Sequence, residues 1–527
     1  MPIQPGLERI GLLLKGTSFP WKSIHVAGTN GKGSICAWAT HLFKRRCIKA
    51  GTFTSPHLIN RWDCIQIDGE PVEERRFRRV ENYFKGINEQ QGIGASEFEL
   101  LTATAFQLFN DREVQVGIVE VGMGGKLDAT NILQNQVVSV ISKIARDHEA
   151  FLGNTIEEIA QHKAGILRPN VPYLVNPANE WNVQDVILKY ARDIGAGPRL
   201  QLRNLQTNQK FFTTKDWKAF AETRFPFERD NAVLAYLAFL WTCEAMHFPT
   251  PKAQSFLKKM RNRKHPGRLH DKGCLAVFGP RVKVLIDGAH NEDAALALSA
   301  YIKRYYRKRS YVKGGPDHNQ VVWVLAMTEG KDVRKVLTAL LEPGDSVVTT
   351  TFGPVDGMPW VKPMDPVELL KIAQEVQPDI TGLANAQRGA HHALCTAKYL
   401  SNPKDKVVLA GSLYLCGDFY READAVEKNP DALDLPYIHD KERGRVNRFL
   451  SKHPRDRNQN AGHEIPAELE LESEELADRE RKRQELEDEI KALERQIKGL
   501  DKPESQGVTA ASHHDIETIY RGVLRRQ

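Results

Sequence analysis

The chain has 527 residues, a formal net charge of +7, 41% hydrophobic and 27% charged residues. This composition is typical of a globular protein with room for about three domains, and it excludes a collagenous or low-complexity chain. No apolar run approaches the roughly 20 residues that a membrane-spanning helix needs, so we expect no membrane partner. The N-terminal sequence has neither an apolar core nor an Arg- and Ser-rich stretch, which predicts a cytoplasmic location and leaves a mitochondrial pool open.

Cysteines and basic clusters are both given structural interpretations. The seven cysteines are far apart and form no C-x-x-C pair, which favours reduced thiols in the core over disulfides or a zinc site. Basic clusters at 75–79 and 303–309 have no aromatic-interleaved nucleic-acid motif beside them. We interpret them as solvated helix faces and expect no nucleic-acid partner, since the positive charge also suits anionic small molecules.

From residue 23 to about 173, apolar strand-like runs alternate with helical stretches. The strand-like runs are I-H-V-A (24–27), V-G-I-V-E-V (116–121) and V-V-S-V-I-S-K-I (137–144). Such alternation predicts βαβ units and a mostly parallel sheet covered by helices. Functional loops are then expected at the carboxyl ends of the strands.

The sequence Ile24–Ser34 reads I-H-V-A-G-T-N-G-K-G-S and predicts a phosphate-binding loop. Gly28, Gly31 and Gly33 allow a tight turn that aims backbone N–H groups at an anion, and Lys32 adds a point charge. The helix that we expect to begin near the end of this run contributes its positive end. A glycine turn that merely joins strand to helix is the structural alternative, but a central lysine is a poor choice for it.

A second α/β series is predicted from about Cys274. Its strand-like runs are V-K-V-L-I-D (282–287), V-V-W-V-L-A-M (321–327), S-V-V-T-T-T (346–351) and V-V-L-A-G-S (407–412), with a helical run over 292–306. The charged stretch 258–268 between the two series ends in Pro-Gly and is a plausible hinge.

Beyond about residue 440 the composition changes to charge, Asn and Pro, which is typical of a solvated linker. Leu and Ile at 486, 490, 493, 497 and 500 recur at spacings of four and three. They predict a helix over 468–500 that can pair with itself or a partner, and a solitary frayed helix is the alternative. We therefore predict domains at 1–265 and 266–440 and a tail at 441–527.

Eight further blocks follow the loop in order. They are T-F-T-S-P-H-L (52–58), S-E-F-E-L-L-T-A-T-A-F (96–106), V-E-V-G-M-G-G-K-L-D-A-T-N (119–131), D-H-E-A-F-L-G-N-T (147–155), K-A-G-I (163–166), H-P-G-R-L (265–269), D-G-A-H-N (287–291) and G-S-L-Y-L-C-G (411–417). Together they resemble the Mur ligase superfamily and its folate branch, the dihydrofolate and folylpolyglutamate synthases, over about residues 1–425. G-M-P-W (357–360), together with D-H-E-A-F-L-G (147–153) and L-Y-L-C-G (413–417), further resembles the fungal dihydrofolate synthases.

The resemblance implies an α/β fold with a P-loop-containing, Mur-ligase-like N-terminal ATP-binding domain and a smaller, Rossmann-like C-terminal domain. It implies an ATP-dependent ligase that joins L-glutamate to 7,8-dihydropteroate through an acyl phosphate. A folylpolyglutamate synthase or a bifunctional enzyme acting on tetrahydrofolate is the alternative. An inactive ATP-binding interaction module is the third possibility, against which the retained set of charged motif residues argues.

The resemblance also implies the nucleotide contacts. They are Gly28, Thr29, Asn30, Gly31, Lys32, Gly33, Ser34, Asn231, Arg268, Asp287 and His290. Lys32 and the loop amides would hold the β- and γ-phosphates, Asp287 the ribose, and Arg268 would neutralise charge on the transferring phosphoryl group. The Gln that the family carries three residues before the nucleotide-contacting Asn is Glu228 here.

Ser55, Glu120 and His148 are the implied Mg²⁺ ligands, with oxygen donors and one imidazole as a hard cation requires. Taken singly, they would be interpreted as a helix cap, a salt-bridge partner and a loop histidine. In the family the lysine of K-A-G-I, Lys163 here, is carbamylated by CO₂ to help bind a second Mg²⁺, which needs an amine with a lowered pKa. The usual preceding Glu is His162. Lys32, Lys163, His148 and Arg268 are thus the implied catalytic residues.

The pterin acceptor is implied to lie against two segments of the first domain. These are Ser96, Glu97, Phe98 and Glu99, and Leu127, Asp128 and Ala129, where a ring can stack and carboxylates can accept from the 2-amino edge. A core role for Phe98 is the alternative. The glutamate pocket is not legible, but it needs a cation such as Arg421 or Lys331.

Overall fold

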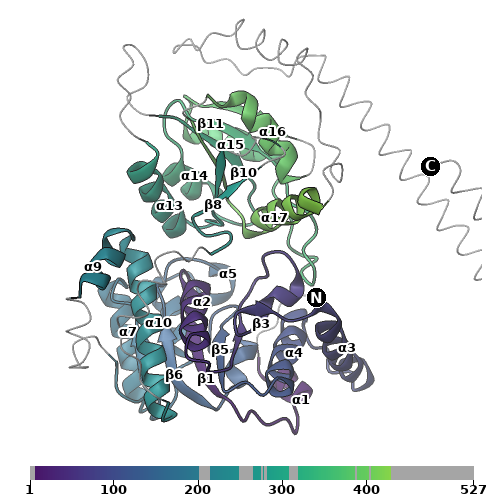
Figure 1. The fold of residues 1–527 in the computed structure, drawn as a ribbon, viewed down its shortest axis with the longest axis vertical. Coiled ribbons are helices and arrows are strands. Elements are labelled where there is room, and N and C mark those ends of the chain that lie inside the picture. Colours follow the sequence, from purple (N-terminus) through teal and green to yellow (C-terminus); the bar gives the residue numbers. More distant parts are fainter. Residues whose placement is uncertain are drawn as a thin grey trace, which may run out of the picture. The chain divides into compact units, whose positions relative to one another are not determined.

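The computed structural model describes residues 6–200, 214–248, 265–274, 277, 282–307, 319–385, 389–402 and 405–428. All of them belong to one compact unit, Met1–Lys452. The predicted tail helix over 468–500 and its pairing lie outside the described residues, as does most of the predicted hinge. Within the described part, the chain forms two sheets, each with its own helices (Figure 1).

The first sheet has seven strands in the order β4-β3-β2-β5-β1-β6-β7 among the described residues. The strands are β1 (Lys22–Ala27), β2 (Ala50–Phe53), β3 (Ile65–Ile67), β4 (Glu70–Pro71), β5 (Val116–Glu120), β6 (Gln136–Ile141) and β7 (Tyr173–Val175). Strands β2, β5, β1, β6 and β7 are parallel, and only β3 and β4 at one edge are antiparallel. The prediction of a mostly parallel sheet is confirmed, and β1 lies between β5 and β6, so their carboxyl ends meet.

Helices cover both faces of this sheet because its strands are apolar on both sides. They are α1 (Glu8–Leu13), α2 (Lys32–Lys44), α3 (Glu74–Gln90), α4 (Glu97–Asp111), α5 (Glu149–Leu152), α6 (Ile156–Ala164), α7 (Trp181–Asp193), α9 (Lys215–Glu222) and α10 (Pro226–Ala245), with short 3₁₀ turns η1 (Arg61–Cys64) and η2 (Ala129–Ile132). One core joins α2 and α10, where the Phe43 and Phe239 ring centroids are 4.9 Å apart. A second core holds α1, α3 and α4, with Phe106 against Trp21.

The second sheet has six strands in the order β12-β11-β10-β13-β9-β8 within the same described ranges. The strands are β8 (His270–Gly273), β9 (Lys283–Ile286), β10 (Val321–Leu325), β11 (Ser346–Thr349), β12 (Thr381–Ala384) and β13 (Lys406–Ala410). The helices are α13 (Glu292–Tyr305), α14 (Val333–Leu340), α15 (Pro366–Val376), α16 (Ala390–Leu400) and α17 (Leu413–Lys428). Only β8 is antiparallel to its neighbour. One core contains α13, α14 and α15 and the other α16 and α17, which agrees with the predicted Rossmann-like α/β domain.

Six of the seven cysteines are buried and free, as predicted, but Cys47 is exposed. It follows the end of α2 in a turn with φ of 56°, so the prediction of a core position was wrong for this residue. Among the residues that the structure describes, no helix is both long enough and apolar enough to cross a membrane. The cytoplasmic location stays a prediction.

Candidate active site

The predicted phosphate-binding loop, called the phosphate loop below, follows β1 at the carboxyl edge of the first sheet. Gly28 and Gly31 have φ of 143° and 92°, a region that side chains with a Cβ rarely adopt. A Cβ on Gly28 would overlap the buried Ser142 hydroxyl, and one on Gly31 would overlap the Asn231 amide. Both glycines are therefore required by backbone conformation and by close neighbours, and Asn231 lies against the loop as expected.

Helix α2 begins at Lys32, earlier than the predicted start near Ser34, because Gly31 in its left-handed conformation already forms the N-cap. No side chain caps this end, so its first-turn N–H groups can bind an anion. Thr29 holds the loop in place, since its Oγ1 donates to the Ala145 carbonyl at 3.0 Å and accepts from the Ala145 N–H at 3.1 Å.

Lys32 and Glu120 face each other across this loop. Lys32 Nζ donates to the Thr29 carbonyl at 3.1 Å and lies 3.8 Å from Glu120 Oε1. Glu120, the last residue of β5, is only 5% exposed, and its Oε2 accepts from the Ser55 N–H at 3.4 Å. Burial raises the pKa of Glu120, and the charges of Lys32 and Arg268 oppose that rise. A buried carboxylate with little direct pairing is thus held beside the loop.

The predicted metal ligands Ser55, Glu120 and His148 suit a magnesium ion only if phosphate oxygens or water complete its coordination. In the described part of the chain, no three His, Cys, Asp or Glu side chains are grouped closely enough to hold a metal by themselves. Ser55 and Glu120 adjoin each other, whereas His148 is engaged with Asp147. Protein-bound Mg²⁺ commonly has one or two carboxylates and takes its other ligands from phosphates and water. The Ser55–Glu120 pair beside the phosphate loop fits that pattern.

Lys163 lies near the end of α6 and is buried, with 4% exposure. Its Nζ donates to the Gly28 carbonyl at 2.8 Å, so this amine lies directly behind the phosphate loop. Burial, with the charge of Lys32 adding to it, lowers the pKa of Lys163 to about 7. The preceding His162 uses its carbonyl to accept from the Lys126 N–H at 2.8 Å. The buried position of Lys163 behind the loop is thus the main cause of its lowered pKa.

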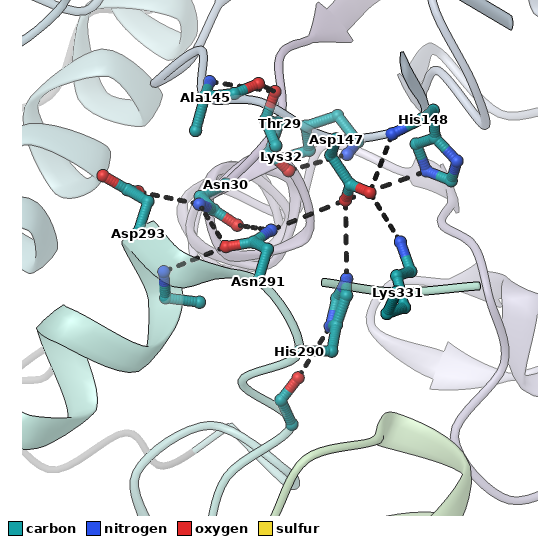
Figure 2. Close-up of polar contacts among 12 residues, drawn as sticks. Thr29, Asn30, Lys32, Ala145, Asp147, His148, His290, Asn291, Asp293 and Lys331 are labelled. Atoms are coloured by element: carbon teal, nitrogen blue, oxygen red, sulfur yellow. Dashed lines mark hydrogen bonds and ion pairs between the residues drawn. The ribbon is translucent and has the colours of Figure 1, made fainter. Parts of the chain in front are cut away.

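Asp147 joins groups from both sheets, and sequence reasoning missed it (Figure 2). Lys331 Nζ donates to Asp147 Oδ1 at 2.5 Å, and His290 Nε2 lies 3.7 Å from Oδ2. His148 donates its backbone N–H to Oδ1 at 2.9 Å and places Nε2 3.9 Å from Oδ2. The cluster therefore gathers Asp147, His148, His290 and Lys331 at one place.

Within the Asp147 cluster, the pKa values of both Asp147 and His148 are lowered, for different reasons. Burial would raise the pKa of Asp147, but the contact with His290 and nearby positive charge outweigh it and hold that pKa well below its usual range. Desolvation lowers the pKa of His148, and the charge of Asp147 opposes this, while the charge of Lys331 adds to the lowering. His148 is therefore uncharged near neutral pH, and Lys331 is the cation that balances Asp147.

The N-cap and first turn of α13, which follow β9, also contact the phosphate loop directly. Asn30 Nδ2 donates to Asp293 Oδ2 at 2.7 Å and to Asn291 Oδ1 at 3.2 Å, and Asn291 Nδ2 donates back to Asn30 Oδ1 at 3.2 Å (Figure 2). Asn291 and Asp293 were not predicted as site residues. The sequence signal that could have identified Asn291 and Asp147 is their place in two motif blocks. Asn291 is the last residue of D-G-A-H-N, and Asp147 is the first residue of D-H-E-A-F-L-G.

Asp287 and Arg268 complete the second sheet's contribution. Asp287 directly follows β9 and is buried, and its carboxylate accepts from the Leu269 N–H at 2.8 Å and the Ala289 N–H at 2.9 Å. Burial raises the pKa of Asp287, which the charge of Arg268 opposes. The charge of the exposed Arg268 thus opposes the rise in pKa of both Asp287 and Glu120.

Glu228 has a local role at the start of α10. Its carboxylate accepts from the Phe225 N–H at 3.0 Å and pairs with Arg224 at 2.7 Å. It therefore caps the helix that carries Asn231, which accounts for Glu at a position where the resemblance leads one to expect Gln.

The predicted acceptor segment 96–99 forms the first turn of α4. Ser96 is the N-cap, and Glu99 accepts from the Ser96 N–H and from Arg9 Nε at 3.0 Å. These two residues thus have a capping-box role. Glu97 keeps 37% of its side chain exposed, and Phe98 stacks on Phe53 with ring centroids 6.0 Å apart.

The second predicted acceptor segment follows the glycine turn after β5. Leu127 is 42% exposed, and Ala129 is buried at the start of η2. Asp128 is buried, and its carboxylate accepts from the Met123 N–H at 2.9 Å and the Thr130 N–H at 3.0 Å. Asp128 therefore holds its own turn.

A buried network behind Asp128 fixes the protonation of His25 on β1. Thr130 Oγ1 donates its only proton to Asp128 Oδ1 at 2.5 Å. In its contact with His25 Nε2 at 2.9 Å, Thr130 Oγ1 is therefore the acceptor and Nε2 carries the ring proton. His25 Nδ1, 2.7 Å from Gln136 Nε2, is then the acceptor. A second ring proton would place two donors face to face, and burial, with Arg168 adding to it, lowers the pKa of His25 to about 3.

This network predicts a pH-dependent stability. The folded pKa of His25 lies below its ordinary 6.5, so stability is present above about 6.5 and is lost as the pH falls from there towards about 3. We expect His25→Gln, which keeps one donor and one acceptor, to remove a slope that grows as the pH falls below about 6.5 and approaches about 1.4 kcal/mol per pH unit near pH 5. Urea unfolding of both proteins at several pH values between about 7 and 5 measures this. Equal slopes would contradict a buried neutral His25.

The two candidate glutamate-binding cations differ in placement. Arg421 Nη1 donates to the Ile59 carbonyl at 2.7 Å, and the same side chain pairs with Asp418. Lys331 instead belongs to the Asp147 cluster beside the phosphate loop. Of the two, Lys331 is the one that contacts the same carboxylate as the predicted catalytic residue His148.

Comparison with known proteins supports one family. Residues 275–422 match the family model "Dihydrofolate synthetase, C-terminal domain". The chain is 36% identical over 434 residues to a probable dihydrofolate synthetase of Schizosaccharomyces pombe, covering 80% of this chain and 99% of that protein. It is 33% identical over 438 residues to the dihydrofolate synthetase of Saccharomyces cerevisiae, covering 80% and 98%.

A solved structure supports the same fold. The folylpolyglutamate synthase of Mycobacterium tuberculosis, in complex with ADP and AMPPCP, matches with a TM-score of 0.63 and 26% identity. The match covers 80% of this chain and 95% of that chain, so both proteins share one two-sheet architecture.

Proposed function

Because the chain belongs to the family of dihydrofolate synthetases and folylpolyglutamate synthases and is an ATP-dependent ligase that adds glutamate in folate biosynthesis, we propose that its acceptor is 7,8-dihydropteroate. The observation that supports this acceptor is the match of 275–422 to the dihydrofolate synthetase C-terminal domain. That region includes the G-M-P-W turn. The products would be dihydrofolate, ADP and phosphate.

For the nucleotide, we assign the β- and γ-phosphates to the loop amides of 31–34 and to Lys32. Support comes from the uncapped start of α2 and from Lys32 Nζ, which is held at 3.1 Å from the Thr29 carbonyl. The exposed Arg268 would neutralise charge on the transferring phosphoryl group, and His290 would approach the phosphates. Asp287 would contact the ribose, and Asn231, which lies against Gly31, would contact the nucleotide beside the loop.

The reaction would proceed in two displacements. A carboxylate oxygen of the acceptor attacks the γ-phosphorus, the bond to the ADP oxygen breaks, and an acyl phosphate forms. The glutamate amine then attacks the acyl carbon, loses a proton, and phosphate leaves. The side chains described above supply position and charge neutralisation rather than covalent chemistry.

Mg²⁺ would be held by Ser55 and Glu120, with His148 as a further ligand once it leaves Asp147. When bound, the ion neutralises phosphate charge. Lys163, if its neutral amine forms an N–C bond to CO₂ and loses a proton, becomes a carboxylate that can help hold a second ion. The burial of Glu120 and Lys163 beside the phosphate loop supports both assignments.

For L-glutamate, we assign Lys331 rather than Arg421 to a substrate carboxylate. Lys331 already binds a carboxylate, that of Asp147, at 2.5 Å beside His290 and His148. A substrate carboxylate could take the place of Asp147 without desolvating a new cation. Arg421 is committed to the Ile59 carbonyl and Asp418.

For the pterin, Glu97, Phe98 and Leu127 are the acceptor contacts that we favour. Glu97 and Leu127 keep exposed side-chain surface, and Phe98 offers a ring beside Phe53. Ser96, Glu99 and Asp128 instead hold the turns that carry these residues.

We expect kcat/KM for dihydropteroate to exceed that for monoglutamyl tetrahydrofolate by about tenfold or more, measured by ADP release at saturating ATP and glutamate. The pteroate carboxylate lies directly on the benzoyl ring, whereas the γ-carboxylate of a folate lies several bonds further out. One rigid pocket cannot align both with the γ-phosphate. Equal values would indicate a bifunctional enzyme, and the reverse preference a folylpolyglutamate synthase.

A further inference from the structure

Residues 55–61, between β2 and β3, reach from the active site to the second sheet. At one end the Ser55 N–H lies 3.4 Å from Glu120 Oε2. In the middle, Leu58 and Ile59 pack against the core that holds α16 and α17, and Arg421 of α17 donates to the Ile59 carbonyl at 2.7 Å. This segment therefore physically connects the phosphate-loop side of the site with the second sheet.

Arg61, at the end of this segment, is only 3% exposed and is bound through two of its nitrogens. Its Nε donates to Glu81 Oε1 at 2.7 Å. Its Nη2 donates to Glu97 Oε2 at 2.7 Å and to the Glu97 carbonyl at 3.1 Å. Because a guanidinium is planar and rigid, Arg61 fixes both the side chain and the backbone of Glu97.

The third nitrogen of Arg61 meets the G-M-P-W turn of the second sheet. A Cβ on Gly357 would overlap Arg61 Nη1, and Gly357 has φ of +74°. The neighbouring Asp356 accepts from Arg78 Nη2 at 3.2 Å, and Arg78 also binds Glu81 at 3.2 Å. The turn thus abuts the same buried charge cluster that holds Glu97.

We propose that Arg61 is a positioning residue through which the G-M-P-W turn sets the orientation of Glu97 and thereby the affinity for the acceptor. The inference rests on the proposed function in one respect, namely that Glu97 contacts the acceptor. Any displacement at Nη1 must move Nη2, because the guanidinium nitrogens form one rigid plane. The second sheet would therefore tune acceptor binding without touching the acceptor.

The test is Gly357→Ala, assayed by steady-state kinetics of the full chain with dihydropteroate and with ATP as the varied substrate. We expect KM for dihydropteroate to rise about tenfold, which corresponds to the loss of roughly one charged hydrogen bond, while KM for ATP changes less than about twofold. The matched control is Gly195→Ala, since Gly195 has φ of +66° and nothing within 4 Å of its added Cβ. Gly195→Ala places an alanine in the same left-handed backbone conformation as Gly357→Ala, and so has a similar conformational cost, but it does not touch Arg61.

Arg61→Lys tests the same contact by changing Arg61 instead of Gly357. If Gly357→Ala does not fold, the KM for dihydropteroate of Arg61→Lys alone tests the role of Arg61. Lysine keeps a positive charge for Glu81 and Glu97 but has no Nη1, so Gly357→Ala should add little to the KM for dihydropteroate in this background. Effects that multiply independently would overturn the coupling, as would an unchanged KM in both single variants.

Glu97→Gln separates this inference from the proposed function. A raised KM for dihydropteroate in Glu97→Gln, with no change in Gly357→Ala and Arg61→Lys, would overturn the role of Arg61 alone. An unchanged KM in Glu97→Gln would instead remove Glu97 from the acceptor site, and the inference would fail with it.

Discussion

Lys32→Ala is expected to lower kcat by about 10²- to 10³-fold while leaving the fold intact. The Lys32 ammonium is held 3.1 Å from the Thr29 carbonyl and 3.8 Å from Glu120 Oε1, so it is preorganised beside the phosphate site. Because the side chain is not part of an apolar core, its loss removes charge stabilisation rather than packing. ADP formation and thermal unfolding of the same preparation measure the two effects.

Lys44→Ala is the matched control for this variant. Lys44 lies at the other end of α2 and pairs with Glu70 at 2.7 Å on the surface. It should keep nearly full activity, since a surface pair contributes little. A folded Lys32→Ala protein with activity close to that of Lys44→Ala would contradict the assignment of the phosphate loop.

Lys163→Ala is expected to lower kcat by about 10²-fold or more, because a charge stabiliser of the transferring phosphoryl group would be lost. At a pKa of about 7 a substantial fraction of the amine is neutral near pH 7, and that form reacts with CO₂. If the carbamate is the working group, acetate or another short carboxylic acid should restore part of the activity by filling the vacated space.

Lys163→Met separates the carbamate from a merely structural role. The Met side chain fills the space near the Gly28 carbonyl, so this variant should lose activity and show no rescue by acetate. A structural role predicts that Lys163→Met is active, or that acetate restores neither variant. Either result would contradict carbamylation.

Much of the fold was predictable because its signals are local. Short apolar runs that are bounded by turns and alternate with helical stretches predict mostly parallel α/β sheets. The chain has two such series, and both sheets are present. The Gly28–Lys32 turn is equally local, since left-handed glycines and a strand-to-helix junction lie within a few residues. Motif blocks predicted the family, which the relatives confirm.

Only the tertiary structure decided which side chains meet. Asp147 with Lys331, Asn30 with Asp293, and Arg61 with Gly357 are pairs from different sheets. No periodicity of the chain encodes such contacts, because they depend on strand order and on how the loops of the two sheets lie together.

The Ser96–Glu99 capping box shows a different limit. Its spacing is visible in the chain, but whether those groups face a substrate or their own helix end depends on the partners that folding brings to them. The sequence by itself therefore determined the two sheets, the glycine turn before α2 and the family. The folded arrangement decided that the Glu97 side chain stays partly exposed, that Lys163 is buried against Gly28, and that Asp147 lies beside Lys331, His148 and His290, because burial and pairing are properties of neighbours in space.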